Sequence, residues 1–185
     1  MTRRLAPGAV LALVAPLLAG CVGITAAEAG PAVASQNARQ SAVAVDTYYG
    51  LGTPFGESGG GIGVGPELRG KVGPNLGQAA LGFFAFAMGG APVGPGLGFV
   101  PFARAGLSML QYESIEGVSS TGFGGVYTSG GVLLPFFAEH GLTLTLNAEY
   151  DIRRGNVPDT GFFSLLVGWG AFLADTKKPS GPAAP

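Results

Sequence analysis

The chain has 185 residues, of which 34 are Gly and 14 are Pro, and its formal net charge is −1. Because Gly costs a helix about 1 kcal/mol and Pro about 3 kcal/mol relative to Ala, and both are spread along the chain, a long helical bundle is excluded. Only 11 % of the residues are charged but 10 % are aromatic, which excludes intrinsic disorder, and the 10 basic residues do not exceed the 11 acidic ones, so no nucleic-acid partner is expected.

The first 20 residues are organised as a secretory signal peptide. Arg3 and Arg4 form a short basic start, and the stretch that follows is apolar and carries no charge. This stretch is too short to span a bilayer and contains Pro7 and Pro16. We therefore predict that the protein is exported and that residues 1–20 are removed.

The signal peptide ends in Leu18-Ala19-Gly20-Cys21, which resembles the lipobox of bacterial lipoproteins. The resemblance implies cleavage between Gly20 and Cys21, a diacylglyceryl thioether on Cys21 and acylation of the new amino terminus. A thiolate is a strong nucleophile and suits this chemistry, and no second Cys competes for it in a disulfide. The alternative is an ordinary signal peptide that is cut nearby. Val22 follows the Cys where an Asp often retains lipoproteins in the inner membrane, so the resemblance points to the outer membrane.

The segments that flank the predicted domain lack large side chains. Residues 22–41 are rich in Ala, Gly, Ser and Gln, and we interpret residues 21–41 as the lipidated Cys followed by a flexible tether. Residues 175–185 form a polar, Pro-rich tail. The folded domain is therefore expected at residues 42–174.

Alternation of side chains with a period of two predicts that this domain consists of β-strands. The alternation is most regular in residues 142–153, where Leu142, Leu144 and Leu146 are followed by polar neighbours, and it is also clear in residues 62–71. Segments rich in Gly and Pro between the candidates predict turns. We expect seven strands and suspect an eighth that the pattern does not locate. In chain order the candidates are residues 42–50, 62–71, 79–88, 97–113, 121–137, 142–153 and 161–173.

The lengths of these segments favour an all-β, antiparallel up-and-down β-barrel of about eight strands. Several candidates reach 10 to 13 residues, whereas strands of globular proteins centre on about 5–6 and strands that cross a bilayer need about 9–11. The low charge and positive mean hydropathy are unsuited to a surface that faces water. The pattern over residues 42–173 resembles the small eight-stranded β-barrels of bacterial outer membranes. The alternative fold is a soluble β-sandwich or a lipocalin-like barrel.

A membrane barrel turns its apolar side chains towards lipid and its polar side chains towards the interior. The predicted interior charges would have to pair there, because an unpaired buried charge is costly, and eight strands leave room only for side chains, so the charges would plug the barrel. In a soluble sheet the same residues would face solvent. The set is Glu67, Arg69, Lys71, Arg104, Glu149, Asp151 and Arg153. Aromatic residues near strand ends are expected to form girdles at the membrane interfaces: Tyr48, Tyr49, Phe99, Phe102, Tyr112, Phe136, Phe137, Phe162 and Phe163.

Catalytic and metal-binding signals are weak in this sequence. His140 is the only His, so no His cluster is available for zinc. As a general base it would need Ser108, Ser129 or Ser164 as a nucleophile across the fold. Residues 65–72 approach a P-loop, but Val72 occupies the position of the Ser or Thr that would hold Mg²⁺.

The favoured hypothesis is an exported, lipid-anchored β-barrel of the bacterial outer membrane with a structural or interaction role. We expect no catalysis, no metal and no cofactor other than the acyl groups on Cys21, and membrane lipid is the expected partner. One alternative is a periplasmic lipoprotein β-domain that binds an apolar ligand. The other is a lipid-acting hydrolase that uses His140.

Overall fold

A computed structural model describes most of the predicted domain and part of the segment that precedes it. The predicted signal peptide, Cys21, the C-terminal tail and Arg153 lie outside the described residues. These residues are 22–35, 41–55, 60–90, 98–137, 139–152 and 159–174.

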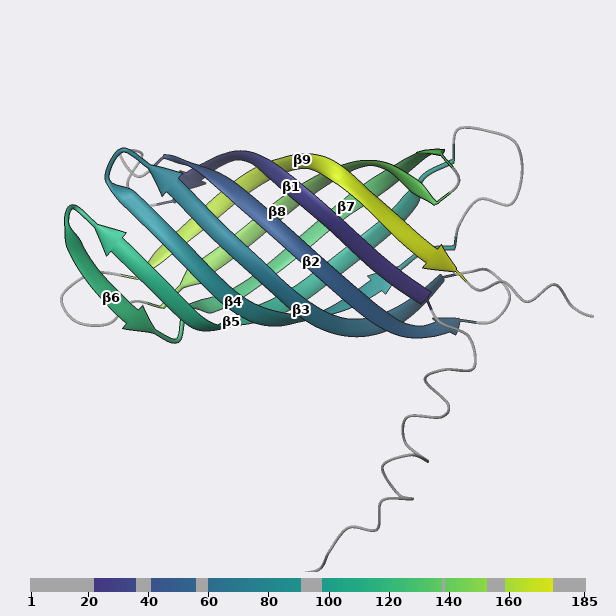
Figure 1. Cartoon of the computed structure of the whole chain (residues 1–185), viewed down its shortest axis with the longest axis horizontal. Coiled ribbons are helices and arrows are strands. Elements are labelled where there is room, and N and C mark those ends of the chain that lie inside the picture. Colours follow the sequence, from purple (N-terminus) through teal and green to yellow (C-terminus); the bar gives the residue numbers. More distant parts are fainter. Residues whose placement is uncertain are drawn as a thin grey trace, which may run out of the picture.

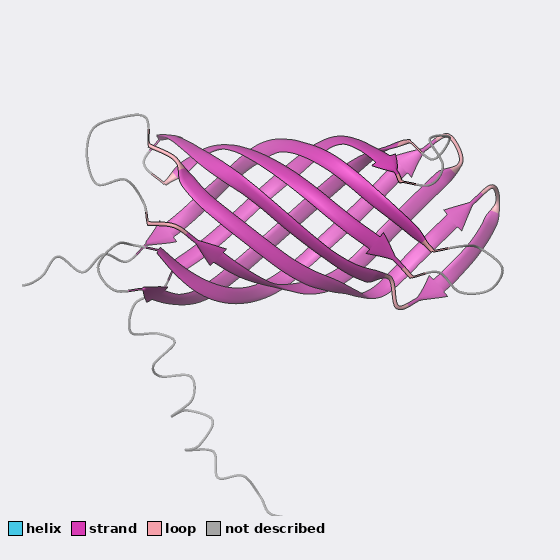
Figure 2. Ribbon diagram, turned by 180° about the vertical axis from the view of Figure 1, so that it is seen from behind, coloured by secondary structure: helices cyan, strands magenta, loops and turns pink. Residues whose placement is uncertain are grey.

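The described residues form nine β-strands in one antiparallel sheet (Figures 1 and 2). Neighbouring strands pair in antiparallel fashion in the order β4-β3-β2-β1-β9-β8-β7-β5-β6. Because β4 also pairs with β5, the sheet closes on itself. The strands are β1 (Val22–Ala34), β2 (Ala42–Phe55), β3 (Gly60–Gly73), β4 (Leu76–Met88), β5 (Val100–Ile115), β6 (Val118–Gly122), β7 (Gly125–Phe137), β8 (His140–Asp151) and β9 (Thr160–Ala174).

Eight of the strands form a closed barrel, which confirms the predicted fold class. Strand β6 is outside the barrel wall: it pairs only with the last five residues of β5, from Gln111 to Ile115, and extends this hairpin beyond the rim (Figure 1). We call the end of the barrel with this hairpin the hairpin end. The opposite end, where β1 begins and β9 stops, is called the terminal end.

The prediction of a flexible tether is wrong for Val22–Ala34, which is strand β1. This strand pairs with β2 on one side and with β9 on the other, so it is the eighth strand that the sequence pattern did not locate. Its outward positions are small, such as Ala27 and Ala29, and this weakens the contrast between its two faces. Neighbouring strands supply the backbone hydrogen bonds, which do not depend on large side chains.

The two faces of the strands have the orientation expected of a membrane barrel. On β8, Leu144 and Leu146 point outward and are 41 % and 67 % exposed, whereas Thr143, Thr145 and Asn147 are buried inside. The alternation repeats along the other strands. A soluble sandwich or lipocalin-like domain requires the reverse arrangement, with apolar side chains in the centre, so that alternative is wrong.

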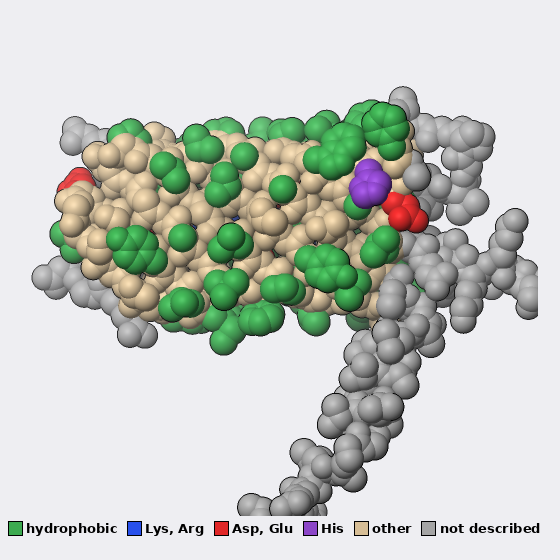
Figure 3. Space-filling view, in the orientation of Figure 1, with side chains coloured by type: hydrophobic (Ala, Val, Ile, Leu, Met, Phe, Trp, Pro, Cys, Tyr) green, Lys and Arg blue, Asp and Glu red, His purple; other side chains and the backbone are tan. Residues whose placement is uncertain are grey.

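The outer wall of the barrel is apolar on every side. Each of the eight barrel strands exposes large hydrophobic side chains, and Figure 3 shows them across the visible face. The charged residues that are not buried inside are, within the described part of the chain, Glu116, Glu139 and Asp159, and all three lie outside the strands. Representative outward residues, one from each barrel strand, are Val33, Val45, Val64, Phe83, Leu107, Val126, Leu146 and Leu165.

The predicted aromatic girdles are correct only in part. Phe136 and Phe137 face outward at the terminal end, where the Phe137 ring packs 6.3 Å from the Trp169 ring. Tyr49 also faces outward, but it lies near the middle of β2. Tyr48, Phe102 and Phe162 are 5 % exposed or less and belong to the interior. The alternation decides this difference, because two neighbouring aromatics on one strand point to opposite faces. Among the described residues, no helix is long and apolar enough to cross a bilayer.

Deletion of residues 22–34 tests the role of β1. We expect the deletion to abolish folding, because β2 and β9 would then each have an unpaired edge and the interior charges would face lipid. Circular dichroism in detergent micelles and resistance to protease would measure the loss. Deletion of residues 175–185 is the control and should leave both signals unchanged. A folded barrel after removal of residues 22–34 would restore the tether interpretation.

Candidate functional site

The interior of the barrel is the most unusual part of the molecule, because charged side chains fill its middle. Apolar side chains close it at both ends. At the terminal end the largest cluster includes Val22, Phe86, Met88, Val100, Leu133 and Phe172. At the hairpin end Leu76 and Phe162 pack with two Ala residues and with Ile115. Charged side chains lie against both clusters: the Arg104 guanidinium is 5.7 Å from the Phe84 ring of the first, and the Lys71 ammonium is 4.4 Å from the Phe162 ring of the second.

Arg104 on β5 organises the part of the charged layer nearest the terminal end. Its Nη2 atom lies 3.0 Å from Asp46 Oδ2 and 3.5 Å from Glu28 Oε2, and its guanidinium carbon lies 3.6 Å from the centroid of the Tyr48 ring. Glu28 also accepts a hydrogen bond from Thr145 Oγ1 at 2.7 Å. The Arg104 side chain is fully buried, so these carboxylates and this ring supply the polar environment that water would otherwise provide.

Arg69 on β3 occupies the centre of the layer. Its Nη2 atom lies 2.9 Å from Glu149 Oε2, and its Nε atom lies 4.0 Å from the Asp46 carboxylate. The guanidinium stacks 3.9 Å above the Tyr127 ring, and the Tyr127 hydroxyl donates a hydrogen bond to Glu67. Asp46 thus contacts both Arg69 and Arg104, which joins the two parts into one network.

Lys71 extends this network towards the hairpin end. Its Nζ atom lies 2.9 Å from Glu149 Oε2 and 3.2 Å from Asp151 Oδ2. Gln78 accepts a hydrogen bond from Lys71 and donates one to Asp151 at 2.9 Å. The ammonium also lies 4.4 Å from the centroid of the Phe162 ring, so the last charged pair abuts the apolar cluster that closes this end.

The strand period explains why these residues meet. Glu67, Arg69 and Lys71 alternate along β3 and so share its inward face. Asp46 lies directly opposite Arg69 on the paired strand β2. The partners Glu149 and Asp151 come from β8, across the barrel, about 80 residues away in the chain. The local alternation therefore determines which face of a strand a side chain lies on, and closure of the barrel determines which residues it contacts.

The structure places six of the seven predicted interior charges inside the barrel. Arg153 lies outside the described residues. The six are Glu67, Arg69, Lys71, Arg104, Glu149 and Asp151, none more than 7 % exposed.

Sequence reasoning missed several members of the network. Glu28 was assigned to the tether, and Asp46 was passed over in a short candidate strand, although both are buried. Tyr48 was assigned to a girdle instead of the interior, and Tyr127 and Gln78 were not singled out. Strict alternation through residues 42–50 is the signal that would have located Asp46. For Glu28 the sequence offers no such signal, because small outward side chains weaken the alternation of β1.

Free space within the charged layer is small where it can be measured. Between Asp46, Arg69 and Glu149 there is free space of only about 10 Å³, roughly enough for one water molecule. No group of three or more His, Cys, Asp or Glu residues suited to a metal ion occurs in the described ranges. The paired charges of the interior can therefore brace the wall electrostatically.

In the structure, His140 and the three serines considered for the hydrolase alternative lie on different faces of the barrel wall. His140 is exposed at the start of β8, and Figure 3 shows this single histidine on the outer surface. Ser108, Ser129 and Ser164 are buried on the inward face, so none is oriented towards His140. Residues 65–72, the near match to a P-loop, are an ordinary stretch of β3.

Comparison with known proteins finds the fold but no close relative. The sequence matches no protein-family model and no curated protein sequence. The crystal structure of Neisserial surface protein A is similar with a TM-score of 0.53 and 16 % identity, over 82 % of this chain and 96 % of that chain. A de novo designed transmembrane β-barrel has a TM-score of 0.47 and 10 % identity over 83 % of this chain and 95 % of its own. Ail, the attachment invasion locus protein of Yersinia pestis, has a TM-score of 0.41 and 11 % identity over 83 % of this chain and 99 % of its own. At these identities the likeness to Neisserial surface protein A concerns the fold alone.

Replacement of Arg104 tests the network. Arg104→Met should lower the free energy of unfolding by about 3–5 kcal/mol, because it leaves Glu28 buried without a cation and leaves Asp46 with only the more distant Arg69. Urea titration of the barrel in detergent micelles, followed by the fluorescence of its single Trp, would measure the change. The triple variant Arg104→Met with Asp46→Asn and Glu28→Gln should recover much of the loss. If the single variant is as stable as the wild type, the network does not brace the wall.

Proposed function

We propose that the protein is a membrane-spanning β-barrel of the bacterial outer membrane with a structural or interaction role, and that it is neither a channel nor an enzyme. One observation carries this proposal: apolar side chains cover the outer wall, while charged side chains are buried inside and most of them form ion pairs. Such an exterior is costly in water and favourable in hydrocarbon. The barrel strands, at 12 to 16 residues, exceed the about 9–11 residues that a tilted strand needs to cross a bilayer.

The filled interior supports a role other than transport. Charged networks and two apolar clusters occupy the space that a solute would have to cross. In the described part of the chain the apolar side chains of the interior pack against one another in clusters, which argues against the ligand-binding alternative. The separation of His140 from the buried serines removes the support for a hydrolase.

The β5–β6 hairpin is the part of the described chain best placed for contacts outside the membrane. It extends past the rim (Figure 1), and its residues from Val118 to Thr121 are exposed. A tight turn at Glu116 and Gly117, with positive φ angles of 51° and 84°, fixes its tip. The Tyr112 hydroxyl lies 3.0 Å from Ser119 Oγ and links the two strands of the hairpin. A preformed hairpin loses little conformational entropy on binding.

The lipid anchor is proposed from the lipobox together with the position of β1. Cleavage before Cys21 leaves the strand that starts at Val22 intact. A cut further along, for example after Ala29, would remove inward residues such as Ile24 and Glu28 and would open the barrel. The acyl chains on Cys21 would then adjoin the rim at the terminal end, with no tether between the anchor and the wall.

Leu68→Arg tests membrane insertion directly. Leu68 lies near the middle of β3 and is 58 % exposed on the outer wall. In phosphatidylcholine vesicles the variant should lose about 2–4 kcal/mol of unfolding free energy, because an arginine near the bilayer midplane is poorly solvated. Thr121→Arg, on β6 outside the barrel wall, is the matched control and should lose almost nothing. Equal stabilities of the two variants would contradict insertion.

Cys21→Ala separates the anchor from the barrel. We expect the variant to incorporate no radiolabelled palmitate and still to require detergent for extraction, because the strands hold it in the membrane. Palmitate labelling of the wild type and of the variant, followed by fractionation, would measure both properties. Unlabelled wild-type protein would contradict lipidation. Release of folded Cys21→Ala into detergent-free buffer would contradict the membrane barrel.

A further inference from the structure

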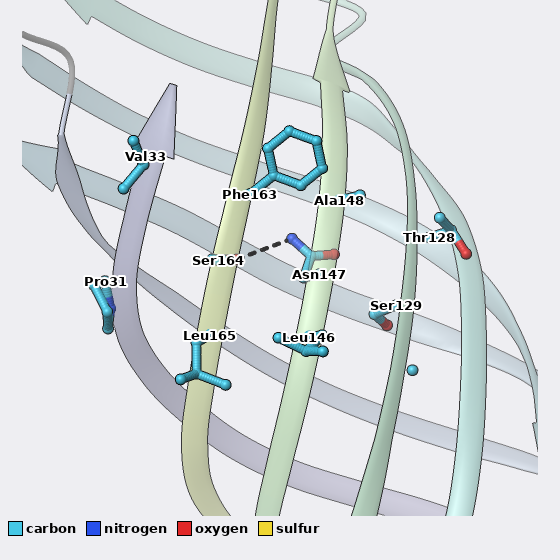
Figure 4. A pocket seen from close by; sticks show the side chains of 11 residues that line it. Pro31, Val33, Thr128, Ser129, Leu146, Asn147, Ala148, Phe163, Ser164 and Leu165 are labelled. Atoms are coloured by element: carbon cyan, nitrogen blue, oxygen red, sulfur yellow. Dashed lines mark hydrogen bonds between the residues drawn. The ribbon is translucent and has the colours of Figure 1, made fainter. Parts of the chain in front are cut away.

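A groove in the outer wall crosses strands β1, β7, β8 and β9 in the half of the barrel nearer the hairpin end. Its volume is about 680 Å³, within the range of about 300–1,000 Å³ typical of small-molecule sites. Figure 4 shows Val33 of β1 and Phe163 and Leu165 of β9 on one side of Leu146 of β8. These four side chains are between 43 % and 67 % exposed, so the groove opens on the outer surface and not into the interior.

Small residues create the groove. At Gly130 of β7 the outward position has no side chain, and it pairs with Leu146 of β8. The next outward pair on these two strands, Thr128 and Ala148, also has small side chains. The outward positions of β9 carry the large side chains of Phe163 and Leu165. The large outward side chains of β9 therefore lie beside a stretch of β7 and β8 whose outward side chains are small. The backbone of this stretch forms the floor of the groove.

The groove has no polar side chain suited to a charged ligand. Asn147 and Ser164, which contribute to its floor, turn their side chains inward and are hydrogen-bonded to each other at 3.2 Å. The hydroxyl of Thr128 donates to the backbone carbonyl of Arg104 at 3.3 Å. What remains accessible is an aromatic ring, aliphatic side chains and a flat floor, which together suit a flexible hydrocarbon chain.

We propose that this groove holds one acyl chain of a membrane phospholipid and retains it more firmly than the rest of the wall does. The proposal rests on the proposed membrane location, because the groove is continuous with the apolar wall that faces hydrocarbon. The acyl groups on Cys21 do not reach it. Cys21 adjoins the terminal end of β1, whereas Pro31 and Val33, which border the groove, lie about ten residues further on, roughly 33 Å along a strand.

Gly130→Leu places a large side chain in the groove at a position whose backbone has space for a Cβ atom. The only atom within 4 Å of a Cβ built at Gly130 is the Phe102 carbonyl oxygen at 3.9 Å, an ordinary contact. Ala85→Leu is the matched control, because Ala85 is an exposed residue of the outer wall on β4 and does not line the groove. Both variants place a leucine on the lipid-facing surface, so they differ mainly in whether the groove is blocked.

The experiment is native mass spectrometry of the full mature chain in nonionic micelles supplied with palmitoyl-oleoyl phosphatidylethanolamine. The wild type and Ala85→Leu should each retain one phospholipid. Gly130→Leu should show at least a tenfold smaller bound fraction, with an unchanged circular dichroism spectrum. Equal retention by all three proteins would overturn the proposal, as would palmitate bound in place of the phospholipid. A dimer that Gly130→Leu abolishes would instead identify a second copy as the occupant and would also overturn it.

A separate measurement keeps this result distinct from the proposed function. If the proposed membrane location fails, the wild-type chain stays soluble without detergent and Leu68→Arg is not destabilised in vesicles. If only the acyl-chain site fails, the chain still requires detergent and Leu68→Arg is still destabilised, but Gly130→Leu retains lipid as the wild type does.

Discussion

The pairing of β1 with β9 is the contact on which the rest of the molecule depends. It joins the first and last strands and closes the ring, with register from Val22 opposite Ala174 to Ala34 opposite Phe162. Without it, two strand edges would present unpaired backbone groups, which hydrocarbon cannot solvate. The same contact completes the enclosure around Arg104, since Glu28 of β1 is one of its partners. The same strand therefore closes the wall and supplies a carboxylate to Arg104.

The interior network is best understood as a consequence of the apolar exterior. A sheet has two faces, and if one faces lipid, the polar half of each alternating strand can only be inside. Buried ion pairs add little stability compared with apolar packing, but removal of one partner is costly. Asp46 contacts Arg69 and Arg104, and Glu149 contacts Arg69 and Lys71, so single substitutions should affect the whole layer and their effects should not be additive.

Two features of the barrel lie on its outer surface, apart from the interior network. The hairpin formed by β5 and β6 offers a preformed polar surface beyond the rim, and the recess at Gly130 interrupts an otherwise covered wall. Neither depends on the interior charges. The two surfaces also lie in different environments, since one extends past the barrel and the other lies in the apolar wall, so they are suited to different partners.

The sequence by itself determined the strand class, the location of most strands and the division of each strand into an apolar and a polar face. That is because the period of two is a property of the local backbone, as the unbroken alternation of residues 142–153 illustrates. It missed β1, where small outward side chains erase the contrast, and it misassigned Tyr48, Phe102 and Phe162, because proximity to a strand end does not tell which way a side chain points. Only the tertiary structure decided that the leucines of β8 face outward and that Glu149 pairs with Arg69 about 80 residues away. Alternation determines which residues share a face of a strand. Which face points inward, and which residues meet across the barrel, is determined only when the strands close into a ring.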